Sequence, residues 1–548
     1  MDAASLRPRL VAVCEAGRRE GLHLLLHSRA PRWIAVNAVG LAVAQRCDGA
    51  HSVQEIAAEV ARRWSQPIGS VLADVEAYIA QLAQAGFLED FVGEAPSPAK
   101  ASPRLSTSPP SPPLKGEESI TPPSLLREEN ITPPSLLREE NITPPSLSGK
   151  GAGGLGYPAE KGAGGLGYPA AKGAGGLGHP AGKGTEGSGA AAGTGSRPPA
   201  PWRLHLDLTD ACNLRCLHCG IAGNGDGRTH LDAALARDLI GQAAAAGAEG
   251  IAFSGGEPLL HPDLLALLAC AAPRLKTLLA TNAHLIDDEA AAALVRLGVI
   301  VQVSLDGADA ATHDRIRGVA AFERTWRGIE RLQRAGIGER LALNVTLMRP
   351  NIGQVAEIVA LAERRGIPAV RFTALQRMGR AAGRWAGLAP TADEYAEAYR
   401  YLYRYRSSAG LALSPELLGL EPEPPEQGLW CGLGRTLLVN ARGDVYPCGL
   451  FVGPQFRLGN VRDTPLADAL ASPALAHLIG RCERRRETIA ECRACAWQHF
   501  CQAGCAGSVW HLHGTLDATD GLCAVRRELF AELMIARATA YGIVRRIS

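Results

Sequence analysis

Residues 204–219 of this 548-residue sequence read LHLDLTDACNLRCLHC. An apolar strand candidate, 204–209, leads directly into a C-x3-C-x2-C motif formed by Cys212, Cys216 and Cys219. Three thiolates on one short loop can hold three irons of a [4Fe–4S] cube and leave the fourth iron open to a substrate or cofactor. A zinc site completed by His218 is the alternative, although a ligand inside the loop makes tetrahedral geometry awkward.

Short apolar strand candidates alternate with helical stretches, such as 231–246 and 289–297, from residue 202 to about 375. This alternation predicts parallel β-α-β units, either open or closed into a barrel. Six units are two fewer than a complete eight-stranded barrel contains. We therefore predict an α/β fold over 201–390 with strands at 204–209, 251–254, 277–281, 299–305, 341–347 and 369–374.

The second strand candidate ends in Ser254-Gly-Gly-Glu-Pro258. Adjacent glycines let a backbone approach a ligand closely, so we expect this turn to clasp an amino-acid head group while Glu257 balances its ammonium. An ordinary tight turn is the alternative for this motif by itself. Because it follows the three-cysteine loop by one β-α unit, the sequence resembles the radical S-adenosylmethionine (SAM) superfamily, whose fold is a partial (β/α)6 barrel.

This resemblance implies a set of site residues. The [4Fe–4S] cluster would be held by Cys212, Cys216 and Cys219, and its fourth iron would bind SAM. Gly255, Gly256, Glu257 and Pro258 would contact the methionine end of SAM, and Ser304 and Arg317 its carboxylate and ribose region. Arg315 is a second candidate because the spacing from Ser304 is one residue longer than in relatives. A salt bridge at the barrel rim is the alternative role for either arginine.

Eight of the 14 cysteines lie beyond residue 430. Seven of them follow the spacing of the SPASM extension of radical SAM enzymes, which residues 391–548 resemble. The resemblance implies two auxiliary [4Fe–4S] clusters, one at Cys492, Cys495, Cys501 and Cys523 and the other at Cys431, Cys448 and Cys505. The second set has no fourth cysteine upstream, so that cluster has an open iron or takes Cys482. A zinc ion bound by Cys492, Cys495, Cys501 and Cys505 is the alternative. The remaining Cys14, Cys47 and Cys270 fit no motif and are interpreted as small buried apolar residues.

A small α+β module is predicted at 10–95. Strand candidates begin at Leu22 and Trp33, and Ser52 with Glu55 forms a capping box that opens a helix. A second helix is expected over 74–87. The module resembles the winged-helix-like peptide-binding chaperone of pyrroloquinoline quinone biosynthesis (PqqD-like), which implies that it binds the leader of a ribosomal precursor peptide by strand addition. A DNA-binding winged helix is the alternative, but few lysines and no basic recognition helix weigh against it.

The segment 96–200 is a Pro/Gly-rich repeat array with 20 glycines and 18 prolines in 105 residues. The eleven residues ITPPSLLREEN occur twice in succession from Ile120. These units have too little apolar surface to bury, so we predict a disordered linker that tethers the captured peptide near the barrel.

Bulk composition narrows the class of protein. The net charge of +2 indicates no general surface for polyanions, and no apolar run is long enough to span a bilayer. The N-terminal residues contain no secretion signal, so we expect a cytoplasmic protein whose thiols bind metal. No acid or base stands out, and Gly449 after Cys448 disfavours formylglycine formation, since sulfatase-maturing relatives place an Asp there.

We therefore predict a radical SAM oxidoreductase that cleaves SAM reductively to a 5′-deoxyadenosyl radical and cross-links or otherwise modifies a ribosomally made precursor peptide. Flavodoxin or ferredoxin would reduce it, and neither nucleic acid nor membrane would be a partner. The alternatives are a radical SAM enzyme of cofactor biosynthesis, acting on a haem-like or quinone molecule, and an iron–sulfur redox scaffold with no enzymatic activity.

Overall fold

The computed structural model describes residues 6–19, 21–89, 160–161, 165–166, 202–221, 229–416, 429 and 431–540. The predicted disordered linker, 96–200, lies outside these residues except for two short strands, β6 (Glu160–Lys161) and β7 (Gly165–Leu166), which pair antiparallel. In the described part of the chain, no helix is both long and apolar enough to cross a membrane.

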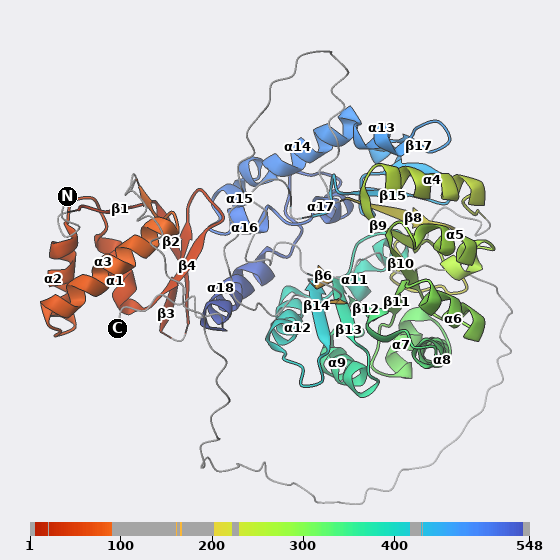
Figure 1. The fold of residues 1–548 in the computed structure, drawn as a ribbon, viewed down its shortest axis with the longest axis horizontal. Coiled ribbons are helices and arrows are strands. Elements are labelled where there is room, and N and C mark those ends of the chain that lie inside the picture. The colour runs from red at the N-terminus through yellow and green to blue at the C-terminus, as the bar shows by residue number, and fades with distance from the viewer. Residues whose placement is uncertain are drawn as a thin grey trace, which may run out of the picture. The chain divides into compact units, whose positions relative to one another are not determined.

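Six consecutive parallel strands form the centre of the largest sheet (Figure 1). They are β8 (Trp202–Asp207), β9 (Ala248–Ser254), β10 (Lys276–Thr281), β11 (Ile300–Ser304), β12 (Leu341–Leu347) and β13 (Ala369–Ala374). Each overlaps a strand predicted from the sequence, and β12 and β13 have the predicted bounds. The predicted α/β fold built on six parallel units is therefore confirmed.

This sheet is open and is extended at both edges. At one edge β14 (Ala412–Glu416) pairs parallel with β13. At the other edge β15 (Thr436–Val439), from the cysteine-rich segment, pairs parallel with β8. The antiparallel strands β16 (Asp444–Tyr446) and β17 (Gly459–Asn460) follow, so ten strands form one sheet. The cysteine-rich segment thus continues the sheet of the barrel.

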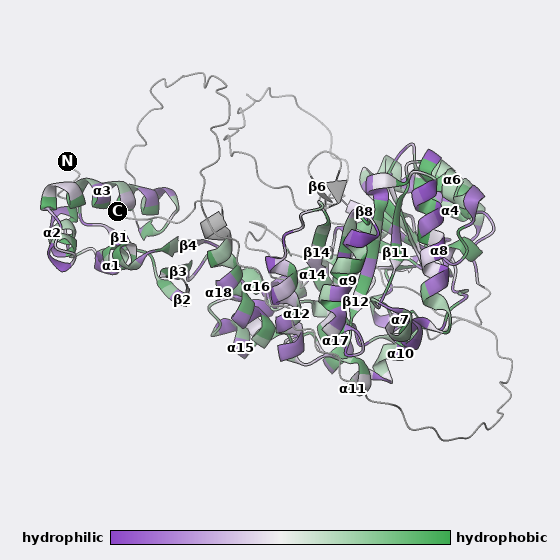
Figure 2. Ribbon diagram, turned by 90° about the horizontal axis from the view of Figure 1, so that it is seen from below, coloured by the Kyte–Doolittle hydropathy of each residue, from purple (hydrophilic) through white to green (hydrophobic). Residues whose placement is uncertain are grey.

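Helices follow one side of the parallel strands (Figure 1). They are α4 (Ala233–Ala245), α5 (Leu264–Ala271), α6 (Asp288–Arg296), α7 (Ala310–Arg317), α8 (Ala321–Arg334) and α9 (Val355–Arg364), with the single turns η2 (Pro258–Leu260), η3 (Gly338–Arg340) and η4 (Ile352–Gln354). Asp232, Asp287 and Asp309 cap α4, α6 and α7 by accepting a backbone N–H of the first turn. Figure 2 shows apolar and polar faces on these helices, as expected where one face covers a sheet.

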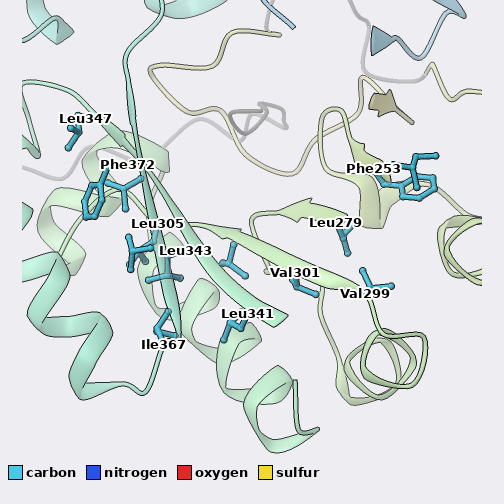
Figure 3. Close-up of a cluster of buried hydrophobic side chains, with 14 of the residues drawn as sticks. Phe253, Leu279, Val299, Val301, Leu305, Leu341, Leu343, Leu347, Ile367 and Phe372 are labelled. Atoms are coloured by element: carbon cyan, nitrogen blue, oxygen red, sulfur yellow. The ribbon is translucent and has the colours of Figure 1, made fainter. Parts of the chain in front are cut away.

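The strands alternate apolar and polar side chains, and this alternation positions the site. Val301 and Val303 of β11 belong to the hydrophobic core. Figure 3 shows Val301 in this core with Phe253, Leu343 and Phe372 from other strands. The intervening Gln302 and Ser304 are polar and equally buried. Because successive side chains point to opposite faces of a strand, the second face of the sheet is both buried and polar.

The segment after β13 is mainly helical. The capping box at Thr391 and Glu394 opens α12 (Ala392–Arg404), which is rich in tyrosine. The other elements are α10 (Gly379–Ala382), α11 (Trp385–Leu388), η5 (Pro454–Phe456), α13 (Leu466–Leu470), α14 (Pro473–Thr488), α15 (Ala490–Arg493), α16 (Gln498–Cys501), α17 (Ala506–His513) and α18 (Cys523–Ala540).

The N-terminal module contains a three-stranded antiparallel sheet in the order β2 (Val13–Arg19), β3 (Leu22–His27), β4 (Trp33–Val36). Three helices follow, α1 (Ala38–Arg46), α2 (Val53–Arg63) and α3 (Ile68–Gln84), and β1 (Arg9–Leu10) pairs with β5 (Leu88–Glu89). The predicted capping box of Ser52 and Glu55 is present. The helix expected over 74–87 begins six residues earlier, after Pro67, and α1, capped by Asn37, was not predicted.

Candidate functional site

The loop with Cys212, Cys216 and Cys219 directly follows β8, and all three thiols are buried, with exposures of 1–5%. Burial raises the pKa of Cys216 to about 11, and the Arg317 guanidinium opposes this rise. The thiol of Cys212 interacts electrostatically with those of Cys216 and Cys219, and the thiol of Cys216 also interacts with that of Cys219. The structure therefore brings the three predicted thiols together at the carboxyl end of the first barrel strand.

Two distant segments fix the backbone of this loop. The N–H of Leu217 donates to the carbonyl of Ile316 at 2.9 Å. Arg380 donates its backbone N–H to Cys219 O at 2.9 Å and its Nε to Cys216 O at 2.7 Å. Arg380 was not predicted as a site residue, because it lies 164 residues along the chain from Cys216 and carries no local signal.

Gly255 and Gly256 lie against the backbone that leads into the cysteine loop. Gly256 N donates to Thr209 O at 2.6 Å, and Glu257 N donates to Ala211 O at 2.8 Å. A Cβ at Gly256 would lie 2.5 Å from the carbonyl carbon of Ala211, and Gly255 has a φ of +123° with Thr209 N 3.0 Å from its Cβ position. These positions need glycine because two backbone segments meet here. This close approach between two parts of the protein was not predicted from the motif.

Glu257 is buried within its own turn. Its carboxylate accepts from the N–H of Asn282 at 2.8 Å, from Thr281 Oγ1 at 2.7 Å and from the N–H of Leu259 at 3.2 Å. Burial raises the pKa of Glu257 to about 7, although these hydrogen bonds oppose the rise. Pro258 occupies the first position of η2 and is buried.

A small pocket lies beside these residues at the carboxyl ends of β9, β10 and β11. Its lining comprises Leu214, Cys216, Ser254, Gly256, Glu257, Ala280, Thr281, Asn282, Ser304 and Arg317. Five predicted site residues are among them: one thiol, Gly256, Glu257, Ser304 and Arg317. Gly255 and Pro258 do not line the pocket. Asn282 does, and its Nδ2 donates to Asn213 Oδ1 at 2.7 Å, within the cysteine loop. No motif in the sequence includes Asn282, so it was not predicted.

The alternatives left open at Arg315 and Arg317 are distinguished by burial. Arg315 is exposed and contacts Pro350 O at 3.5 Å. Arg317 is 1% exposed, and its Nε donates to Asp306 Oδ2 at 2.7 Å. Its Nη1 lies 3.9 Å from the sulfur of Cys216, and its Nη2 has no hydrogen-bond partner among the described residues. The salt bridge is therefore present at Arg317, and the same side chain also lines the pocket.

Asp306 organises this corner of the site. Burial is the largest single effect and opposes its ionisation, but Arg317, His218 and the N–H of Thr346 together outweigh burial and hold the pKa of Asp306 below its usual value. Nε2 of His218 lies 3.4 Å from Asp306 Oδ2, and burial lowers the pKa of His218 to about 4. His218 thus faces a carboxylate, which disfavours the zinc site in which it would complete the ligand set.

The polar face of the sheet extends away from the pocket. The register sets Ser304, Asn344 and Arg371 side by side on β11, β12 and β13. Gln302 and Asn344 are each 1% exposed, and neither side-chain amide has a hydrogen-bond partner among the described residues. Arg371 donates to Glu416 through Nε and Nη2 and has no such partner for Nη1. Buried polar groups without partners are costly, so this face is suited to a polar ligand.

The C-terminal cysteines form two sets of thiols that interact electrostatically. The thiol of Cys492 interacts with those of Cys495, Cys501 and Cys523. The thiol of Cys448 interacts with those of Cys505 and Cys431. Burial raises the pKa of both Cys492 and Cys448 to about 12. The two sets are the two that the sequence predicted.

A buried ion pair joins the two sets. Arg526, on α18 just after Cys523, donates to Asp520 at 2.7 and 2.6 Å, and both side chains are 2% exposed. Asp520 also accepts from the N–H of Cys505 at 3.2 Å. This pair therefore links the backbone of Cys505 to α18, the helix that begins at Cys523.

The donor chemistry of all three sets fits iron–sulfur clusters, because soft thiolates are their usual ligands. All 14 cysteines are free thiols. Within residues 6–540, the described side chains include no group of three His, Cys, Asp or Glu that is placed to hold one metal ion. A single zinc ion needs its thiolates gathered around one centre, whereas each thiolate of a [4Fe–4S] cube binds a different iron.

Three family profiles match the chain. Residues 206–362 match the radical SAM superfamily, 23–88 match coenzyme PQQ synthesis protein D, and 431–496 match the SPASM iron–sulfur cluster-binding domain. The last match lies in the segment that contains both auxiliary sets of cysteines.

Curated relatives align over most of their own length. A mycofactocin maturase of Mycobacterium ulcerans is 31% identical over 337 residues, which are 59% of this chain and 88% of the relative. An AdoMet-dependent heme synthase of Nitratidesulfovibrio vulgaris is 29% identical over 349 residues, 58% of this chain and 91% of the relative. A PqqA peptide cyclase of Gluconobacter oxydans is 28% identical over 335 residues, 60% of this chain and 92% of the relative.

Among solved structures, anSMEcpe with bound AdoMet superposes with a TM-score of 0.52 at 17% identity, covering 62% of this chain and 100% of that one. At this identity the similarity establishes a shared fold.

Proposed function

This chain belongs to the radical SAM superfamily, and from that premise we propose that it is an oxidoreductase that modifies, and most simply cross-links, a ribosomally made precursor peptide. Members of the superfamily use a [4Fe–4S] cluster and SAM, and the SPASM domain adds auxiliary [4Fe–4S] clusters. The observation that carries the proposal is the combination, in one chain, of this core with a module that matches coenzyme PQQ synthesis protein D.

We propose Cys212, Cys216 and Cys219 as ligands of the SAM-binding cluster. Gly255, Gly256, Glu257, Pro258, Ser304 and Arg317 are the proposed residues around SAM. The pocket supports the assignment because it joins Cys216 to Ser304 and Arg317. An unpartnered guanidinium N–H at Arg317 suits a carboxylate, since charge-assisted hydrogen bonds to carboxylates are strong.

When bound, the reduced cluster and SAM supply a 5′-deoxyadenosyl radical that abstracts hydrogen from an unactivated C–H bond. For this step the protein must hold the substrate C–H bond in position and exclude water from the site. Asp306 orients Arg317 through the 2.7 Å ion pair, and Arg380 holds the cysteine loop through Cys216 O. The buried amides of Gln302 and Asn344 are proposed to bind the peptide groups of the substrate, because an amide pairs with both a donor and an acceptor.

The C-terminal sets are the proposed ligands of two auxiliary clusters. One comprises Cys492, Cys495, Cys501 and Cys523, and the other includes Cys431, Cys448 and Cys505. Forming a bond after hydrogen abstraction leaves one electron in excess, and an auxiliary cluster beside the barrel can accept it. We propose flavodoxin or ferredoxin as the reductant that supplies the first electron, in the cytoplasm.

The N-terminal module, 10–95, is the proposed leader-peptide binding domain, with the barrel at 201–390 and the SPASM domain at 391–548. Strand addition needs an exposed sheet edge, and β2 and β4 are the edge strands of the module's sheet. Leader binding here would raise the concentration of the core peptide at the barrel.

A second candidate function is the modification of a small haem-like molecule, because an AdoMet-dependent heme synthase is among the relatives. The module at 23–88 favours the peptide, since a free tetrapyrrole has no leader to bind. One experiment with reduced, iron-reconstituted protein and SAM distinguishes the two functions.

In this experiment the protein is incubated with a candidate ribosomal precursor peptide that carries its leader, and in parallel with a tetrapyrrole. We expect 5′-deoxyadenosine from SAM and a peptide that has lost two hydrogens. Cys212→Ala should abolish both products. If the wild-type protein with full iron leaves SAM intact, the enzymatic proposal is wrong, and modification of only the tetrapyrrole would establish the second function.

A further inference from the structure

Cys482 is a buried cysteine outside the two sets of cysteines that follow the SPASM spacing. It lies on α14 and is 3% exposed. The three other unassigned cysteines differ from it. The thiol of Cys47 donates to Val43 O at 3.3 Å, one turn back in its own helix, and Cys270 accepts from Arg274 at 3.7 Å near the surface. Cys14 is half-buried on β2.

Two neighbours on the same face of α14 place Cys482 between two proposed ligands. Ile479, three residues earlier, has its Cδ1 2.7 Å from the Cβ position of Gly434, in the segment just after Cys431. Arg485, three residues later, donates to Ala503 O and Gly504 O at 3.0 Å, immediately before Cys505. Residues three apart share one helix face, so Cys482 faces the space that these two segments border.

The surroundings of the thiol agree with this placement. Cys482 packs in one hydrophobic cluster with Cys431 and Cys448. The thiols of Cys431 and Cys505 are near enough to that of Cys482 to interact with it electrostatically. Four thiols from four separate segments therefore converge on one apolar site.

We infer that Cys482 is the fourth thiolate of the auxiliary cluster proposed at Cys431, Cys448 and Cys505. The inference rests on the proposed function, because it requires that cluster to be present. Four thiolates occupy every iron of a [4Fe–4S] cube. This cluster then has no iron open to substrate, and its role is to transfer electrons.

The test uses the full chain with Cys212, Cys216 and Cys219 replaced by Ala, so that only the auxiliary clusters contribute iron, about eight per chain. Cys482→Ala is added, with Cys270→Ala as the matched control. Iron content and the electron paramagnetic resonance spectrum are recorded before and after brief exposure to air. We expect Cys482→Ala to lose about one iron per chain and to develop a three-iron signal, because an iron without a thiolate dissociates readily.

Cys482→Ser distinguishes ligation from packing. A serine oxygen can still bind iron, so this variant should keep about eight irons and show a shifted reduction potential. Cys270→Ala should keep its iron and spectrum after air exposure. If Cys482→Ala does the same, the auxiliary clusters are present but Cys482 is not a ligand, and the inference is wrong. If the parent protein holds no auxiliary iron, the proposed function itself fails.

Discussion

Gly256→Ala should empty the first cluster site and leave the auxiliary clusters in place. In the structure, a Cβ at Gly256 would lie 2.5 Å from the carbonyl carbon of Ala211, where ordinary contacts begin at 3.4 Å. The oxygen of this carbonyl lies closer still, so the Ala211 carbonyl must move by more than about 1 Å, which a backbone atom in a packed site can do only by moving its neighbours. Its immediate neighbour is Cys212, the first proposed ligand.

The energetic cost follows from the hydrogen bonds that this shift breaks. Gly256 N donates to Thr209 O at 2.6 Å, and Glu257 N donates to Ala211 O at 2.8 Å. Each buried backbone group left without a partner costs about 1–3 kcal/mol. We expect the free energy of unfolding to fall by about 3–5 kcal/mol.

The assay compares Gly256→Ala with Gly241→Ala in anaerobically purified protein. Gly241 lies inside α4 with nothing within 4 Å of its Cβ position, so alanine there should stabilise the helix by about 1 kcal/mol. We expect Gly256→Ala to lose about four irons per chain and SAM cleavage, and Gly241→Ala to lose neither. A Gly256→Ala protein with the iron content and SAM cleavage of the wild type would refute the reasoning.

Three further predictions concern other parts of the molecule. Ser52→Ala removes the capping box of α2 and should cost the N-terminal module about 1 kcal/mol in denaturant unfolding, with the iron content unchanged. Asp520→Ala leaves the buried Arg526 unpaired, so unfolding should become about 3–5 kcal/mol easier and iron at the auxiliary sites should fall. Burial raises the pKa of Asp207 to about 7 in the folded protein. The folded state therefore keeps the proton of this carboxyl more tightly than the unfolded state does. The resulting stability is fully present below the unfolded pKa and is lost as the pH rises to about 7. Asp207→Asn should therefore gain stability over the wild type between about pH 4 and 7 in urea titrations; a constant difference at every pH would show that burial does not shift this group.

Local patterns predicted the elements that depend on local interactions. The strands were predictable because runs such as Leu341–Leu347 are mostly apolar and lie between more polar helices. The capping-box residues Ser52 and Glu55 likewise predicted a helix start that the structure contains. The choice between Arg315 and Arg317 could also have been made from the sequence. His313, Ile316 and Arg317 form the buried face of α7 with helical spacing, which leaves Arg315 on the exposed face.

The remaining features depend on pairings between distant segments. The parallel pairing of β15 with β8 joins residues more than 230 positions apart, and no local pattern specifies a partner strand. Asp306 was visible beside Ser304, yet its importance comes from Arg317, His218 and the N–H of Thr346, which only the fold brings to it. The same holds for Arg380 at the cysteine loop.

The pairing of β15 with β8 bears on how the clusters work together. The strand β8 leads directly into the loop of Cys212, and β15 and β16 lead to Cys448. Two proposed cluster sites are therefore attached to one sheet, in which β15 lies between β8 and β16 and pairs with β8 in a register that sets Leu206 opposite Val439. Electron transfer between the proposed cluster of the barrel and the one proposed at Cys431, Cys448 and Cys505 would then cross a distance that this sheet sets. Substitutions that leave every cysteine intact but disturb this register should slow the removal of the last electron more than the cleavage of SAM.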